Sequence, residues 1–135
     1  MKPQLICSSF TIAVAFLLAA SSVGASDSTF TEAQLCQAGI GTLMGRDPKI
    51  IKVTKQHKGI VSLYYIRRDD GTKWSYRCKI EGSNVVWASD TGRWRTHPLD
   101  ERISYRTNGK SLEIIQNYSD GSSTKKSFTP AQIGN

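Results

Sequence analysis

The stretch Thr72–Ile80 constrains the fold more than any other part of the chain, because its side chains alternate in character from one residue to the next. One face of the stretch is apolar: Trp74, Tyr76, Cys78 and Ile80. The other face is polar: Lys73, Ser75, Arg77 and Lys79. A period of two is typical of a strand with one buried face. The pattern therefore predicts a strand of an antiparallel sheet, with Cys78 on its buried side.

A helical periodicity precedes this strand. Thr31 to Gln34 spell a capping box, in which the Thr31 hydroxyl accepts from the Gln34 amide while the Gln34 side chain reaches back. Apolar residues then recur at helical spacing: Ala33, Cys36, Ile40, Leu43 and Met44. Gly45 is a suitable C-terminal cap, and Pro48 prevents continuation. The sequence predicts a helix over residues 32–44 with Cys36 on its apolar stripe.

The first 25 residues have the pattern of a secretory signal peptide. Lys2 is their only charged residue, an apolar stretch runs over Phe10–Ala20, and the small residues Val23 and Ala25 suit a cleavage site before Ser26. The apolar stretch is shorter than the roughly 20 residues that span a bilayer. We therefore expect residues 1–25 to be removed and residues 26–135 to form a single small domain in the periplasm or outside the cell. An uncleaved anchor is the alternative.

Removal of the signal peptide leaves two cysteines, Cys36 and Cys78, and an even number in an exported chain predicts a disulfide. Two buried free thiols are the alternative. The bond would fasten the helix to the inner side of the sheet, since each cysteine lies on the apolar side of its own element. The formal net charge falls from +7 to +6 with the loss of Lys2, which favours acidic partners.

Six further stretches favour strands: Ile50–Gln56, Gly59–Arg67, Asn84–Ala88, Arg102–Thr107, Lys110–Tyr118 and Ser122–Phe128. Turn signals of the Asp-Gly and Asn-Gly type separate several of them. We predict the α+β class, with one N-terminal helix packed on an antiparallel meander of about six to seven strands. A sheet of this length could also curl into a partial barrel.

Catalytic and metal-binding signatures are missing from the sequence. The two histidines have no ligand at metal spacing, so we expect no metal, no cofactor and no catalytic residue of a recognisable type. The sequence likewise holds no nucleic-acid motif, and no second segment could span a membrane. A small exported hydrolase that uses His97 with nearby carboxylates remains an alternative function. Those carboxylates are Asp90, Asp100 and Glu101.

Two candidate binding sites remain. The first is a loop that places two guanidinium groups beside an indole ring, a combination that suits phosphate, carboxylate or a sugar ring. Its residues are Arg93, Trp94, Arg95 and His97. In the alternative interpretation, Trp94 plugs the open end of the sheet and the arginines flank it in water.

The second candidate is a cationic surface on the outward face of the sheet, which could hold an anionic polymer. Its residues are Lys73, Arg77, Lys79, Arg102 and Arg106. The alternative is an ordinary solvated sheet face. We therefore expect a non-enzymatic binding protein whose partner is an acidic protein or an anionic envelope polymer. A structural accessory of an envelope assembly is the third possibility, and the sequence does not determine the oligomeric state.

Overall fold

A computed structural model describes residues 3–4 and 29–134 of the chain. It contains one α-helix, α1 (Glu32–Met44), and seven strands in a single antiparallel sheet. The strands are β1 (Lys52–His57), β2 (Ile60–Ile66), β3 (Lys73–Glu81), β4 (Asn84–Ser89), β5 (Arg102–Asn108), β6 (Ser111–Asn117) and β7 (Ser123–Phe128). The predicted α+β class is confirmed. Apart from residues 3 and 4, the predicted signal peptide lies outside the described residues.

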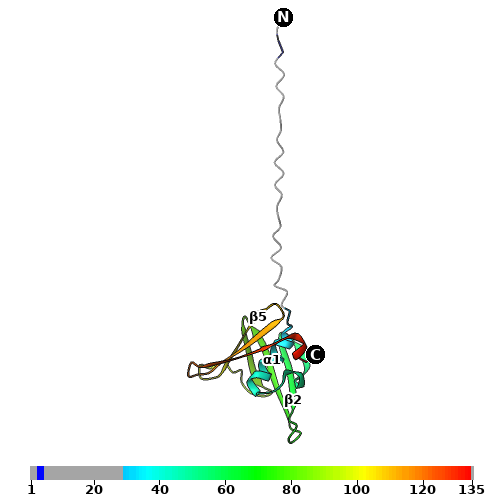
Figure 1. Ribbon diagram of the computed structural model, residues 1–135, viewed down its shortest axis with the longest axis vertical. Coiled ribbons are helices and arrows are strands. Elements are labelled where there is room, and N and C mark those ends of the chain that lie inside the picture. The colour runs from blue at the N-terminus through cyan, green and yellow to red at the C-terminus, as the bar shows by residue number, and fades with distance from the viewer. Residues whose placement is uncertain (1–2, 5–28, 135) are drawn as a thin grey trace.

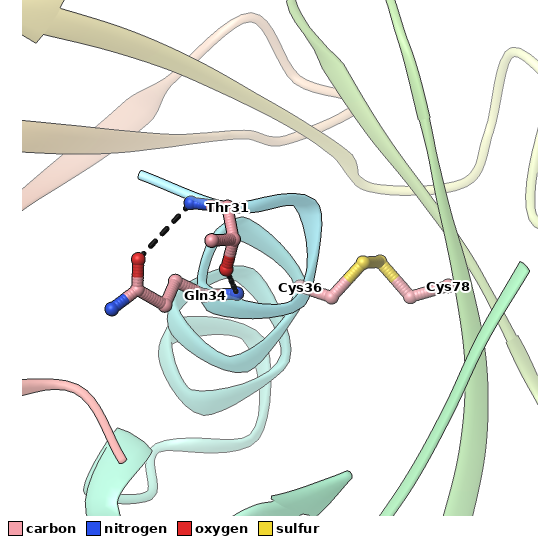
Figure 2. The surroundings of a disulfide bond; sticks show 4 residues. All are labelled: Thr31, Gln34, Cys36 and Cys78. Carbon is pink, nitrogen blue, oxygen red and sulfur yellow. Dashed lines mark hydrogen bonds between the residues drawn. A yellow bond between two sulfur atoms is a disulfide. The ribbon is translucent and has the colours of Figure 1, made fainter. Parts of the chain in front are cut away.

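The helix α1 has the predicted bounds and the predicted cap. The Gln34 backbone N–H donates to the Thr31 hydroxyl at 3.2 Å, and the Thr31 backbone N–H donates to the Gln34 side-chain oxygen at 3.0 Å, as Figure 2 shows. Gly45 ends the helix with a φ of 63°, in the left-handed region that glycine adopts without strain. Local sequence chemistry therefore sets both ends of the helix.

A disulfide bond joins α1 to the middle of the sheet. Cys36 of α1 and Cys78 of β3 are bonded, with their Cα atoms 5.9 Å apart, and both side chains are fully buried. Figure 2 shows the bond crossing from the helix to the strand. The predicted pairing is confirmed, and it identifies the face of the sheet that packs on α1, which we call the inner face.

The sheet is a simple meander in which the strands follow the order of the sequence, from β1 at one edge to β7 at the other. It is not closed into a barrel. The sheet lies around α1, which contacts strands β1 to β6 (Figure 1). Two short 3₁₀ helices, Pro48–Ile50 and Pro130–Gln132, lie before the first strand and after the last. The α-helix of the described residues thus packs on the inner face, and we call the opposite side of the sheet the outer face.

Close approach of α1 to the sheet depends on glycine. A Cβ atom placed on Gly39 would lie 2.8 Å from Cγ1 of Val85 in β4, closer than carbon atoms pack. The core around this contact consists of fully buried aliphatic side chains of the helix and strands: Ile40, Ile51, Val61, Leu63, Leu112 and Ile114. Two polar residues, Gln37 and Gln116, are also buried. Gln37 donates from Nε2 to the Ile51 carbonyl at 2.9 Å, so its amide has a hydrogen-bond partner.

Two local predictions need correction. Ile50 was expected in the first strand, but it ends a 3₁₀ helix that Pro48 begins, because proline fits the first turn of a helix. Trp74 was expected to be buried with Tyr76. Trp74 pairs with the buried Tyr65 of β2 and lies on the same face, but it is near the start of β3 and is 41% exposed. The Arg67 guanidinium lies 5.9 Å from the centre of its ring.

Within the described residues, no helix is long and apolar enough to cross a membrane.

Candidate functional site

Lysine and arginine residues collect on the outer face of β1, β2 and β3. Cross-strand neighbours share a face, and the register aligns Lys55 with Ser62 and Ser62 with Arg77. Five cations lie on this face, which we call the basic face: Lys52, Lys55, Lys73, Arg77 and Lys79. The same three strands contain one carboxylate, Glu81, at the end of β3. The basic face therefore has a strong excess of positive charge.

A β-bulge adds β1 to this surface. Lys52 pairs with Tyr64, and Lys55 pairs with Ser62. The two lysines are three positions apart in β1, whereas their partners are only two positions apart in β2. The register shift between Val53 and Lys55 absorbs the additional residue. Simple alternation would place Lys52 and Lys55 on opposite faces, and neither lysine was among the predicted site residues.

Two aromatic rings accompany these cations. The Lys73 ammonium lies 4.3 Å from the centre of the Tyr64 ring. Trp94, from the loop between β4 and β5, lies against β3, with the Arg77 guanidinium carbon 4.9 Å and the Lys79 ammonium 4.5 Å from a ring centre. Both rings are partly exposed. The structure thus joins the two candidate sites through contacts of Trp94 with Arg77 and Lys79.

The loop of residues 90–101 folds back over the outer face of the sheet. Arg77 donates from Nε and Nη2 to the Ser89 carbonyl, at 3.3 and 3.2 Å, and from Nη2 to the Gly92 carbonyl. By register, Arg77 and Lys79 lie opposite Ala88 and Val86, and both of these outer-face residues are buried. Trp94 therefore packs on the outer side of β3 and β4, and not at the open end of the sheet.

Asp100 holds the two ends of this loop together. Its carboxylate accepts from Arg93 Nη1 at 2.7 Å and from Arg93 Nη2 at 3.0 Å, a bidentate pair, and it also accepts from the His97 backbone N–H at 2.9 Å. The hydrogen bond from Arg93 is the main reason that the pKa of Asp100 falls to about 2. Arg93 is therefore already occupied by a carboxylate of its own loop.

His97 belongs to the same turn. Its Nδ1 accepts from the Leu99 backbone N–H at 3.1 Å, and its own carbonyl accepts from the Asp100 backbone N–H at 2.9 Å. Asp100 contacts the His97 backbone, and the carboxylate lies in the bidentate pair with Arg93. This geometry gives His97 a structural role in the turn.

Arg95, Arg102 and Arg106 lie apart from the basic face. Arg106 of β5 forms an ion pair with Glu113 of the neighbouring strand. Arg95 and Arg102 line a hollow between β4 and β5. Since β4 separates β3 from β5, the predicted cationic surface is divided into two parts.

Metal chemistry has no evident place in the described part of the chain. No group of three or more histidine, cysteine, aspartate or glutamate side chains there could hold a metal ion. Both described cysteines are used in the disulfide. The residues brought together are cations and aromatic rings, which bind anionic and sugar-like groups through charge and stacking.

Comparison with known proteins leaves the site to be interpreted on its own geometry. No protein-family model, no curated protein and no solved structure matches the chain.

Proposed function

We propose that this protein is an exported domain that binds an anionic polymer through its basic face. The observation that carries the proposal is the gathering of five cations on the outer face of three adjacent strands that contain one carboxylate. The Tyr64 and Trp94 rings beside these cations add surfaces on which sugar rings stack. The buried Cys36–Cys78 disulfide favours an oxidising compartment, such as the periplasm or the extracellular space.

The cations of the basic face differ in how far they are free to bind. Arg77 donates to the carbonyl of Ser89, the last residue of β4, and to the carbonyl of Gly92 in the loop, and Lys79 pairs with Glu81 at 3.0 Å. Lys52, Lys55 and Lys73 are exposed, and no described carboxylate lies within ion-pair distance of any of them. The Lys73 ammonium already lies against the Tyr64 ring. We therefore assign most of the binding to the two lysines of β1, at the edge of the sheet.

The spacing of the basic face supports a polymer as the ligand. Neighbouring strands lie about 4.8 Å apart, so positions two strands apart, such as Lys55 and Arg77, are separated by about 10 Å. This separation is close to the Debye length of about 8 Å at physiological salt, so each cation attracts an anionic group nearly independently. Repeating anionic groups along one chain satisfy such an array better than a single small anion does. An acidic protein is the second candidate partner.

Heparin-affinity chromatography with a salt gradient tests the proposal, with heparin as the model polyanion. The double variant Lys52→Glu/Lys55→Glu should elute at much lower salt than the unmodified protein, because it reverses two unpaired charges on the basic face. The matched control is Lys110→Glu/Lys125→Glu, which makes the same change of charge on exposed positions near β6 and β7. The control should elute much closer to the unmodified protein.

Each outcome has a separate meaning. Equal losses in the two double variants would show attraction by net charge alone and would overturn the assignment of the site. No retention of the unmodified protein on heparin would overturn the proposal that the ligand is an anionic polymer, and an acidic protein would remain as the candidate partner. Trp94→Ala should weaken retention on heparin more than retention on a polyphosphate matrix, since the second polymer has no sugar ring to stack on the indole.

A further inference from the structure

A small hollow opens where β4 and β5 separate. These strands pair at only two positions, Asn84 with Ser104 and Val85 with Ile103, whereas β3 and β4 pair at six. The hollow beside this short ladder has a volume of about 180 Å³, and Val85, Val86 and Ile103 give it an apolar wall. Binding sites for drug-sized ligands measure roughly 300–1,000 Å³, so the ligand that fits here is smaller.

The charged residues of the hollow are balanced, with Arg95 and Arg102 against Glu81 and Glu101. Glu81 is neutralised by Lys79. Glu101 accepts from Gln116 Nε2 at 2.6 Å, and no described cation forms an ion pair with it. The hollow therefore contains one carboxylate without a cationic partner.

The arginines supply the opposite charge. Arg102 has no ion pair with any described carboxylate, and Arg95 reaches Asp100 only at 3.8 Å. The Arg95 Nε atom is buried and has no acceptor among the described residues. A buried donor without a partner is costly, so an added acceptor near Arg95 would be stabilising.

Both faces of the sheet contribute charges of both signs to the hollow. By register, Arg102 shares the outer face with Glu81. On the inner side, Glu101 accepts from Gln116, the partner of the inward residue Ile103, and the Arg95 guanidinium carbon lies 5.4 Å from the ring centre of Trp87, which pairs with Cys78. A simple anion in the hollow would meet Glu101, and a simple cation would meet the two arginines. A ligand that carries both a positive and a negative group finds an oppositely charged side chain for each group.

We propose that this hollow binds a small zwitterion of amino-acid size. Its carboxylate accepts from Arg95 and Arg102, and its ammonium group donates to Glu101. The apolar wall of Val85, Val86 and Ile103 receives a short aliphatic side chain. This site does not depend on the basic face, since neither Lys52 nor Lys55 lines the hollow.

Isothermal titration calorimetry tests the site with alanine, valine, N-acetylalanine and alanine amide. The two free amino acids should bind, and blocking either charged end should weaken binding about tenfold or more, because each block removes a hydrogen bond to a charged group. Arg102→Gln should weaken binding of alanine by a similar factor. Arg106→Gln is the matched control on the same strand, because Arg106 pairs with Glu113 outside the hollow, and it should bind as the unmodified protein does.

The specificity for the ammonium group is tested through Glu101. Glu101→Gln should weaken binding of alanine and should not weaken binding of N-acetylalanine, because the neutral side chain no longer repels an anion. If the variant does not fold, backbone NMR shifts of the unmodified protein, which should move at Val85 and Ile103 on addition of alanine, replace it. Equal affinity for alanine and N-acetylalanine, or no heat and no shift with any amino acid at millimolar concentration, would overturn the proposal. Retention on heparin is a separate measurement and would not be affected.

Discussion

Reduction of the Cys36–Cys78 bond should lower the free energy of unfolding by about 4 kcal/mol. The two cysteines are 42 positions apart, and the magnitude follows from the entropy that a closed loop of this length removes from the unfolded chain. A domain of this size has a total stability of about 5–15 kcal/mol. The reduced protein should therefore keep about 1–11 kcal/mol of that stability, although its side chains and its core are unchanged.

Equilibrium unfolding in urea measures this effect. With a denaturant dependence of about 1–3 kcal/mol per molar urea, the loss of about 4 kcal/mol should lower the midpoint by roughly 1.3–4 M. The comparison is between the oxidised protein and the same protein unfolded and refolded in a reductant, because the disulfide is fully buried in the native state and a reductant cannot reach it there. The disulfide-free protein keeps both sulfur atoms, so the difference isolates the covalent bond from the packing.

The double variant Cys36→Ala/Cys78→Ala separates the packing contribution. It should be less stable than the reduced protein by about 1 kcal/mol per site, the usual cost of a small deletion in a core. A midpoint that moves by less than about 0.5 M on reduction would refute the reasoning. That result would mean that α1 docks on the sheet through apolar contacts alone, and that the unfolded chain is already compact.

Three further predictions concern the loop and the helix. Carboxyl NMR should give Asp100 a pKa of about 2 against its ordinary 3.8, and Arg93→Gln should raise it. The pKa of Asp100 is lower in the folded protein than in the unfolded chain, so the ionised carboxylate stabilises the fold above pH 4 or so, and this stabilisation is lost as the pH falls through about 2. At that pH we expect the loop amides to exchange faster. A pKa of Asp100 that Arg93→Gln leaves unchanged would contradict this prediction. Arg77→Lys keeps the charge but loses the planar donors, so hydrogen exchange in the loop should accelerate about tenfold, and unchanged exchange would show that the loop does not depend on Arg77. Gly39→Ala should cost about 1 kcal/mol in urea unfolding, since overpacking against Val85 at about 1–3 kcal/mol exceeds the gain in helix propensity of about 1 kcal/mol. A second change, Val85→Ala, should cost less in that variant than alone, and additive costs would exclude the clash.

The elements that the sequence predicted correctly depend on local chemistry. The capping box at Thr31 and the left-handed position at Gly45 define α1 without any contribution from the sheet. The pairing of Cys36 with Cys78 was predictable because two independent periodicities placed both residues on buried faces. The seven strands followed from alternation and turn residues, and their bounds differ from the prediction by one or two residues at most positions.

The candidate site was less predictable because it depends on contacts between distant segments. The bulge between Val53 and Lys55 reverses the face that alternation assigns to the second half of β1, and nothing in the local residue types marks it. The separation of β4 from β5 also has no local signal, although it creates the hollow that Arg95 and Arg102 share. Alternation assigns faces to residues, but it does not say which strands are neighbours along that face.

The loop shows why outward charge on a sheet is weak evidence for a ligand. A segment of twelve residues without regular structure must find partners for its own backbone groups, since buried carbonyls without donors are costly. Arg77, which alternation assigns to solvent, donates to the Gly92 carbonyl of the loop and to the Ser89 carbonyl just before it, and Trp94 covers Arg77 and Lys79. Fewer cations of the basic face are therefore free to bind a ligand than its charge suggests. The free ones are Lys52 and Lys55 of β1 and Lys73, which contacts only the Tyr64 ring. A binding experiment that changes Arg77 would disturb the loop together with the charge, whereas one that changes the two lysines of β1 tests the charge alone.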